Sequence, residues 1–197
     1  MSNFLYYYPN RPTLIPPDPT DVLNPKPDYI RSLEASGLYV GELKWNGDNI
    51  YIYTDTMEIW NRHRERHHYQ PTPEVLDELQ KFPKGAVINA ELMHNRTTDT
   101  KNIIIVHCVM VWKGQPLIGK TWGDSRAIIE GLSYGQHVKL SEVFKDKFWE
   151  HYQQVDGKTI EGIILKNPKG RLVFSTTPIQ DVSWMKKIRK PSKKSPF

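Results

Sequence analysis

The sequence predicts an α+β fold in which antiparallel sheets are flanked by helices. Two observations support this prediction: segments with a strand pattern outnumber helical ones, and the strand segments cluster as hairpins. The chain has 197 residues and contains no internal repeat. A chain of this size can bury roughly 70 % of its unfolded surface, so one domain can fold without disulfide bonds.

Residues 1–37 form a distinct segment, because they hold seven of the fifteen prolines. Proline interrupts helices and the hydrogen-bonded ladders of sheets. We therefore expect an extended arm over residues 1–37, packed on the surface, with a short helix at residues 29–35. We expect residues 38–190 to form the main domain and residues 191–197 a loosely held basic tail, with no second domain.

Apolar and alternating patterns predict the strands of the main domain, and a turn at residues 45–48 joins the first two. These strands span residues 38–43, 49–54, 57–60, 86–92, 103–112, 159–166, 171–175 and 182–189. Three helices are predicted between them. They span residues 73–82, with Thr72 as cap and Pro73 at the first position, residues 124–132, and residues 141–154, with Ser141 as cap.

The composition excludes several classes of protein. Hydrophobic residues make up 38 % and charged residues 25 % of the chain, as in globular proteins. Neither a run of about 18 apolar residues nor a signal-peptide pattern is present, and Cys108 is the single cysteine. We expect a cytoplasmic protein that does not bind membranes.

The net charge of +5 is concentrated near the end of the chain, where six of the nine residues 186–194 are Lys or Arg. Such a patch attracts phosphate backbones or nucleotides. A tail that only improves solubility would have the same composition, so charge alone names no partner.

Lys44 stands at the end of a predicted strand, three residues before Gly47. A lysine in this place can be held toward a pocket, while glycine lets the backbone approach a ligand closely. To attack phosphorus the amine must lose its proton, which nearby cations and partial burial favour. The pattern Lys-x-x-Gly is common by chance and predicts nothing alone.

Arg62 follows the next strand, where its guanidinium could donate paired hydrogen bonds to ribose or phosphate oxygens. The alternative is a solvated basic loop, since residues 62–68 are a dense polar run. His63 and His67 have the i, i+4 spacing of metal ligands, but neither a cysteine nor a predicted helix at these residues supports a zinc site.

Two carboxylates, Glu91 and Glu161, lie in otherwise apolar strands. Burying such a charge is costly unless cations or hydrogen bonds offset it, and Mg²⁺ is a suitable partner. The alternative is the exposed face of an edge strand. For Glu161 we favour function, because Lys166 ends the same strand and brings an amine close to the carboxylate.

The last predicted strand is basic. Alternate residues share one face of a strand, so Lys187 and Arg189 point the same way and could cradle a phosphate, with Ile188 opposite. If the register slips by one residue, Lys186 takes the place of Lys187.

These motifs occur in one order over residues 42–190: lysine turn, arginine, Glu strand, apolar strand, Glu-Gly-apolar-apolar-apolar-Lys, basic strand. The series resembles the nucleotidyltransferase domain of the covalent nucleotidyltransferases, an ATP-grasp-like fold shared by ATP-dependent DNA ligases, RNA ligases and mRNA-capping guanylyltransferases. Residues 161–166 carry the most specific part. Residues 59–63 and 112–117 are more similar to small phage-type DNA ligases.

The resemblance implies that Lys44 takes AMP from ATP, with Lys166 and Lys187 at the α-phosphate. It also implies a metal site for Mg²⁺ or Mn²⁺ at Glu161 and Glu91. The other positions that match nucleotide contacts are Glu42 beside the adenine amino group, the adjacent Leu43, Asn49 near the AMP phosphate and the nick, Arg62 at the ribose, Glu91 at the ribose or metal, His107 stacked on adenine, and Arg189 at a phosphate.

The activity implied is ATP-dependent sealing of 5′-phosphate/3′-hydroxyl nicks in duplex nucleic acid, DNA being favoured over RNA-containing nicks, by a monomer. Four positions depart from the pattern: Asn46 stands where Asp is usual, His107-Cys108 replaces Phe-Asp, and Arg189 replaces a lysine. We also expect no OB-fold domain. RNA ligation, RNA capping with GTP, and a non-catalytic binding module in which Asn46 has cost activity remain the alternatives.

Overall fold

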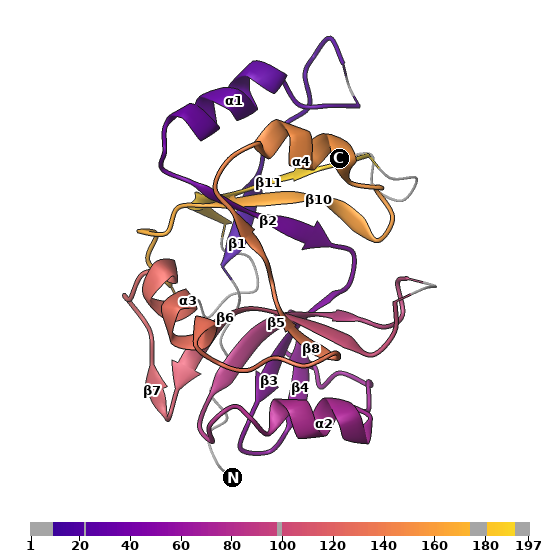
Figure 1. The fold of residues 1–197 in the computed structure, drawn as a ribbon, viewed down its shortest axis with the longest axis vertical. Helices are drawn as coiled ribbons and strands as arrows, with labels where there is room; N and C mark the ends of the chain where they lie inside the picture. Colours follow the sequence, from indigo (N-terminus) through magenta and orange to yellow (C-terminus); the bar gives the residue numbers. More distant parts are fainter. Residues whose placement is uncertain (1–9, 22, 98–99, 174–180, 192–197) are drawn as a thin grey trace.

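The computed structural model describes residues 10–21, 23–97, 100–173 and 181–191. It contains two curled sheets, one above the other in Figure 1, with helices against their outer faces. The predicted α+β class is confirmed. Pairing is mostly antiparallel. Two parallel pairs were not predicted: β1 (Arg11–Leu14) with β11 (Asp181–Arg189), and β6 (Ile103–Trp112) with β8 (Val138–Leu140).

The first sheet has five strands in the order β1-β11-β10-β2-β9. They are Arg11–Leu14 (β1), Asp181–Arg189 (β11), Ile160–Lys166 (β10), Val40–Trp45 (β2) and Val143–Phe144 (β9). Helices α1 (Pro27–Ala35) and α4 (Phe148–Gln154) cover its outer face (Figure 1). Ile30 of α1 and Tyr152 of α4 are buried in one cluster with Ile163 of β10, which anchors both helices to the sheet.

The second sheet has six strands, with β4-β3-β5-β6-β7 in order and β8 paired to β6. They are Glu58–Asn61 (β4), Asp48–Tyr53 (β3), Val87–Met93 (β5), Ile103–Trp112 (β6), Gln115–Pro116 (β7) and Val138–Leu140 (β8). Helices α2 (Pro73–Leu79) and α3 (Trp122–Glu130) pack against this sheet through Leu79 and Ile129.

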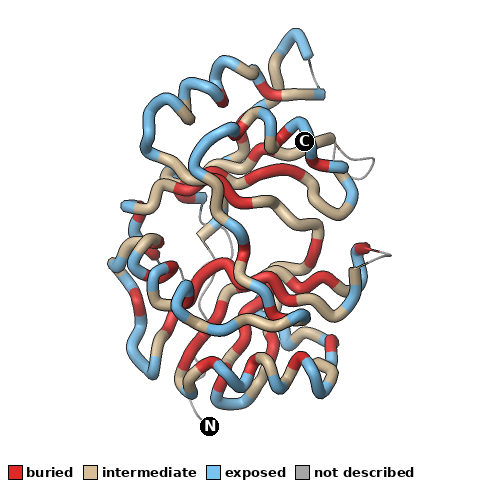
Figure 2. Tube along the Cα trace, in the orientation of Figure 1, coloured by how far each residue is buried: buried red, intermediate tan, exposed pale blue. Residues whose placement is uncertain are grey.

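The apolar strands predicted at the centre of the domain are buried. Of the ten residues of β6, eight are buried, and Figure 2 shows buried segments running along the strands of both sheets, with exposed segments on the helices. In the described part of the chain, no helix has the length and apolar character that crossing a membrane requires.

The turn at residues 45–48 does not close a hairpin. Strand β2 pairs with β10 and β9, whereas β3 pairs with β4 and β5, so this turn carries the chain from one sheet to the other. A Cβ at Gly47 would lie 2.5 Å from the Leu92 carbonyl oxygen and 2.8 Å from Cγ of Glu91. Glycine is therefore required by close approach to β5, and Asn46-Gly47 misleads as a hairpin signal.

The N-terminal arm takes part in a sheet, contrary to the expectation that its prolines exclude ladder pairing. Arg11–Leu14 pairs in parallel with β11, and its register shifts after Pro12. Because β1 lies at the edge of its sheet, a proline that lacks an N–H is tolerated there. The helix expected at residues 29–35 is present and begins two residues earlier, with Pro27 in its first turn.

The helix predicted from residue 141 is wrong in its first half. Residues Val143–Phe144 form strand β9, and α4 begins at Phe148 after Lys147, whose φ of 56° is left-handed. Ser141 caps no helix, because its oxygens accept hydrogen bonds from Arg126. The helix predicted at residues 124–132 begins at Trp122, after a capping box of Thr121 and Asp124.

Two smaller predictions also differ from the structure. Helix α2 starts at Pro73 as expected but ends at Leu79, and the side chain of Thr72 makes no capping hydrogen bond. Of the strand predicted at residues 171–175, Arg171 forms one isolated bridge with Thr121 and residues 172–173 form no strand. Residues 174–175 lie outside the described part of the chain.

Candidate active site

A cavity of about 920 Å³ lies between the two sheets, and both contribute to its wall. Such a volume is in the range of small-molecule sites. Ten of the residues that the sequence singled out line it: Leu43, Lys44, Asn49, Arg62, Glu91, His107, Glu161, Lys166, Lys187 and Arg189. Residues up to 146 positions apart in the chain thus meet in one place, as the order of motifs led us to expect.

Lys44 is held by Glu161 at a bulge in β10. Trp45 and Lys44, neighbours on β2, pair with Ile160 and Gly162, so Glu161 is the extra residue that faces no partner. A bulge of this kind turns a side chain out of the regular alternation. Glu161 Oε1 accepts a hydrogen bond from Lys44 Nζ, and both side chains are about four fifths buried.

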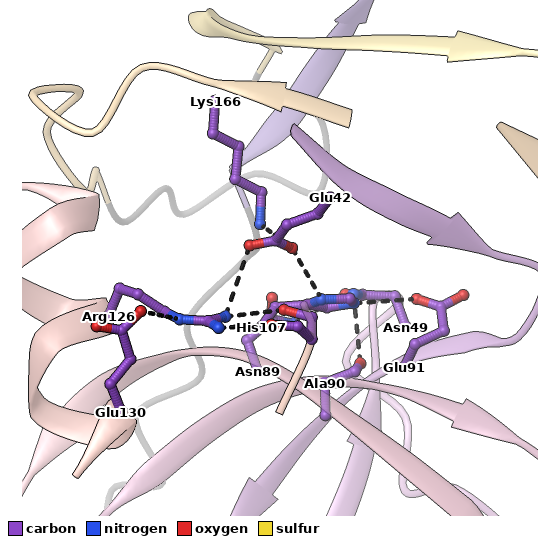
Figure 3. Close-up of polar contacts among 10 residues, drawn as sticks. Glu42, Asn49, Asn89, Ala90, Glu91, His107, Arg126, Glu130 and Lys166 are labelled. Atoms are coloured by element: carbon purple, nitrogen blue, oxygen red, sulfur yellow. Dashed lines mark hydrogen bonds and ion pairs between the residues drawn. The ribbon is translucent and has the colours of Figure 1, made fainter. Parts of the chain in front are cut away.

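Glu42 lies beneath the cavity wall, 1 % exposed, at the centre of a buried charge network (Figure 3). Lys166 Nζ donates a hydrogen bond of 2.8 Å to its Oε2. His107 Nδ1 lies 3.4 Å from the same oxygen, and Arg126 Nη1 lies 3.7 Å from Oε1. Glu42 is not among the residues that line the cavity, so it acts on the cavity through Lys166 and His107, which do line it.

The network fixes the charges of its members. Burial alone would raise the pKa of Glu42, but Lys166 and His107 outweigh burial and lower that pKa to about 2. Burial would lower the pKa of His107, but the carboxylates of Glu42 and Glu91 raise it above its ordinary value. Burial also raises the pKa of the adjacent Cys108 thiol to about 11, so the thiol stays protonated at neutral pH.

Arg126 is a buried cation that the sequence analysis missed. It projects from α3, where Nε contacts Glu130 at 3.0 Å and Nη1 donates to the Ser141 hydroxyl at 2.9 Å. An arginine and a glutamate four residues apart are typical of an exposed helix face. The burial of Arg126 depends on Glu42, 84 positions away, so no local pattern indicates it.

Trp122 was missed too, and it also lines the cavity. Lys166 Nζ lies 5.0 Å from the centre of its ring, within the range of a cation–π contact. Two of the rings in the cavity wall, Trp122 and His107, therefore lie near the Lys166 ammonium group.

Glu91 connects the lysine turn to His107. Its Oε1 accepts a hydrogen bond of 3.1 Å from the Gly47 N–H, and its Oε2 lies 3.9 Å from His107 Nε2. Asn49 lies on the neighbouring strand, where its amide donates to the Ala90 carbonyl and accepts from Asn89 at 3.2 Å. The backbone of the turn is thereby held on the six-stranded sheet.

The basic strand β11 presents Lys187 and Arg189 to the cavity, whereas Lys186 is not among the lining residues. The register given by strict alternation is therefore the one present. Burial lowers the pKa of Lys187, and the nearby cations Arg11 and Lys44 lower it further. Positive charge is thus concentrated along this wall.

The opposite rim carries Arg62 and His63, which contact each other through Nε and Nε2 at 3.2 Å. Asp48 also lines the cavity, but Arg96 lies 2.9 Å from its carboxylate and His67 lies 3.6 Å from it. Because Asp48 is paired with these cations, it is a poor replacement for the aspartate that usually stands at the position of Asn46 in the lysine motif.

Asn46 does not line the cavity. Its side-chain amide donates a hydrogen bond of 2.7 Å to the Lys158 carbonyl, and its backbone N–H donates to Thr159. An aspartate has no donor for the first of these bonds. Asn46 thus ties the lysine turn to the start of β10.

A protein-only metal cage is absent from the described residues, since no three His, Cys, Asp or Glu side chains there are placed to hold a metal ion together. Mg²⁺ does not require such a cage, because one or two carboxylates with water and substrate phosphates suffice. Glu161 fits this requirement: it lines the cavity beside Lys44. The oxygens of Glu91 are engaged by Gly47 and His107, which leaves Glu161 the better ligand.

No known sequence family and no curated protein matches this sequence. Solved structures do match the fold. The ligase domain of M. tuberculosis LigD is similar with a TM-score of 0.57 and 16 % identity over 77 % of this chain. Chlorella virus DNA ligase-adenylate has a TM-score of 0.53 and 12 % identity over 92 % of the chain.

The chain has the fold of the nucleotidyltransferase domain of ATP-dependent ligases. An archaeal ATP-dependent RNA ligase shares this nucleotidyltransferase fold as well, with a TM-score of 0.52 and 13 % identity over 97 % of the chain. The chain spans 53 % of the LigD domain, 69 % of the Chlorella virus ligase and 51 % of the RNA ligase.

Proposed function

We propose that this protein is an ATP-dependent polynucleotide ligase that works through a covalent adenylate on Lys44. One observation carries the proposal: the Lys44 amine lines a nucleotide-sized cavity and contacts Glu161 there. Lys187 and Arg189 line the same cavity and add positive charge to its wall. The fold shared with DNA and RNA ligases supports it.

In the proposed reaction, the Lys44 ammonium gives up one proton to solvent, the amine attacks the α-phosphorus of ATP, and the nitrogen releases a second proton to solvent as the phosphoramidate forms. A P–N bond forms and the bond to the β-phosphate oxygen breaks, so that pyrophosphate leaves with the electron pair. The AMP then passes to the 5′-phosphate of a nick, and the adjacent 3′-hydroxyl displaces it. Lys166 and Lys187 are cations that can offset the phosphate charge during these steps.

Mg²⁺, held by Glu161 with substrate phosphates, would neutralise phosphate charge. Glu161 has a second role in the free protein, because it holds Lys44 in place. Its carboxylate oxygen is then shared between an ammonium and an incoming divalent ion. We therefore expect divalent-ion binding to compete with the Lys44–Glu161 contact.

The base and ribose would lie toward the six-stranded sheet. His107 and Trp122 offer ring faces for stacking on adenine, and Arg62 and Asn49 offer hydrogen bonds to ribose and phosphate. Glu42 would influence the choice of base through Lys166 and His107. Nicked duplex DNA is the substrate we favour. RNA-containing nicks are the second candidate, because an RNA ligase shares the fold as well as the DNA ligases.

The test is incubation of the protein with α-labelled ATP and Mg²⁺, followed by denaturing electrophoresis and intact-mass measurement. We expect a covalent gain of one AMP that Lys44→Ala abolishes, and sealing of a nicked duplex by the wild type only. Labelling by GTP instead would favour RNA capping. Tight ATP binding without any adduct would favour a binding module, and an adduct in Lys44→Ala would refute the nucleophile.

A further inference from the structure

Arg11 is a cation of the cavity wall that belongs to the N-terminal arm. It is the first residue of β1, at the edge of the five-stranded sheet, and it lines the cavity together with Lys44 and Lys187. The three come from strands β1, β2 and β11, which lie in one sheet. None of the contacts proposed for the adenine, the ribose and the α-phosphate of ATP involves Arg11.

The position of Arg11 is built into the sheet. The backbone of β1 pairs with β11, and Arg11 Nε lies 3.2 Å from the Asp181 carboxylate at the start of that strand. This pair holds the guanidinium at the cavity rim, half exposed, where its remaining N–H groups can reach a ligand. An arginine so placed suits bidentate recognition of phosphate.

The charges on this wall are not balanced by the protein alone. Among the described residues, no carboxylate lies within ion-pair distance of Lys187, and Arg11 and Lys44 are the cations that act on it most strongly. Like charges gathered in a half-buried place repel one another unless an anion joins them. Asp181 pairs with Arg11 and Glu161 with Lys44, so an excess of positive charge remains at Lys187, which suits a ligand with several negative oxygens.

We propose that Arg11, beyond Lys187 on the same cavity wall, forms a subsite for the β- and γ-phosphates of ATP, and so for the departing pyrophosphate. The inference rests on the proposed function, because it places the α-phosphorus at Lys44. In the sheet order β1-β11-β10-β2, the strand that carries Lys187 lies between the strand of Arg11 and that of Lys44, and all three residues line the cavity. The rest of the triphosphate would therefore extend from Lys44 past Lys187 toward Arg11.

The role is limited to the first step of the reaction. When the bond between the α-phosphorus and the β-phosphate oxygen breaks, the leaving pyrophosphate gains one negative charge, and Arg11 stabilises it without exchanging a proton. Transfer of AMP to a nick and its displacement by the 3′-hydroxyl involve no pyrophosphate. Arg11 should matter for making the Lys44 adenylate and not for using it.

The experiment compares the wild type with Arg11→Ala, Arg11→Lys and a control, Arg31→Ala. Arg31 is an exposed arginine of α1 that pairs with Asp28 and does not line the cavity. Three rates are measured on each purified full-length protein: adenylation of Lys44 by ATP, discharge of AMP from the adduct by pyrophosphate, and ATP-independent sealing of a nick with a pre-made 5′-adenylate.

We expect Arg11→Ala to slow the first two reactions about 10- to 100-fold, as for the loss of a charge-assisted hydrogen bond, and Arg11→Lys to restore part of the loss. Sealing of the pre-adenylated nick should match the wild type, as should all three rates of Arg31→Ala. Unchanged adenylation in Arg11→Ala, or an equal fall of all three rates, would overturn the subsite; the second result would assign Arg11 to nucleic-acid binding or to the fold.

Failure of the proposed function is distinguishable from failure of the subsite. In that case the wild type forms no adduct at all, but the subsite can still be tested by calorimetric titration with inorganic pyrophosphate. Weaker pyrophosphate binding by Arg11→Ala than by Arg31→Ala would support the subsite even then. Equal binding by the two variants would overturn it.

Discussion

The ammonium of Lys44 and the carboxylate of Glu161 meet across two antiparallel strands, at the single place where β10 has one residue more than β2. Regular pairing would alternate the side chains of residues 160–162 between the two faces of the sheet. The bulge instead gives β10 one residue that pairs with nothing on β2, and that residue is the carboxylate that contacts the amine. The bulge in β10 is therefore what places the Glu161 carboxylate against the Lys44 amine.

Glu161→Gln should reduce adenylation of Lys44 at least 100-fold, because the amide binds a divalent ion poorly and holds the ammonium less well. The loss should be larger in Mg²⁺ than in Mn²⁺, which can be measured from initial rates over a range of metal concentrations. The unfolding midpoint should stay near that of the wild type. A variant that adenylates normally would remove Glu161 from the reaction.

Glu42→Ala should lower the free energy of unfolding by about 3–5 kcal/mol, because it leaves Lys166 and Arg126 buried without their shared partner. Denaturant titration gives the value. The matched control is Glu130→Ala, which removes the other carboxylate of Arg126. Since Glu130 is half exposed, this change should cost less than about 1 kcal/mol. Equal costs would contradict the central place of Glu42.

His107 should make stability depend on pH above neutrality. Its pKa is raised in the folded protein by Glu42 and Glu91, so its contribution is fully present below the unfolded value near 6.5 and is lost as the pH rises through the folded value. We expect the unfolding free energy of the wild type to fall relative to His107→Gln as the pH rises from 6 to about 9. Parallel profiles would show that the pKa of His107 is the same in the folded and the unfolded protein.

Asn46→Asp restores the residue type that is usual in the lysine motif, yet it should not raise activity. The asparagine amide donates to the Lys158 carbonyl, and a carboxylate in its place would face that oxygen without a donor. We expect a loss of about 1 kcal/mol in stability and unchanged or slower adenylation. A tenfold faster adenylation would instead favour the view that Asn46 has cost activity.

The sequence predicted the parts of the site that local patterns define. Strand β10 could be located because its apolar residues form a short run bounded by turn residues, and the two polar positions within it, Glu161 and Lys166, stand out for the same reason. Lys187 and Arg189 were assigned to one face by strand alternation alone, and both line the cavity.

The remaining parts depend on pairing between distant segments. Arg126 has the spacing of a surface helix pair, and its burial becomes visible only when Glu42 is placed beside it. Ser141 has the pattern of a helix cap but accepts from Arg126 instead. Arg11 lies among prolines, which indicate irregular backbone, whereas an edge strand tolerates them.

The passage of the chain between the two sheets at residues 45–48 has a mechanical consequence. Lys44, the proposed nucleophile, lies on the five-stranded sheet, whereas Arg62, Glu91 and His107 lie on or beside the six-stranded one. A nucleotide that touches all four would bridge two separately packed layers. Saturating ATP should therefore make both layers melt together at a higher temperature, so that occupancy of the cavity governs the cooperativity of the whole molecule.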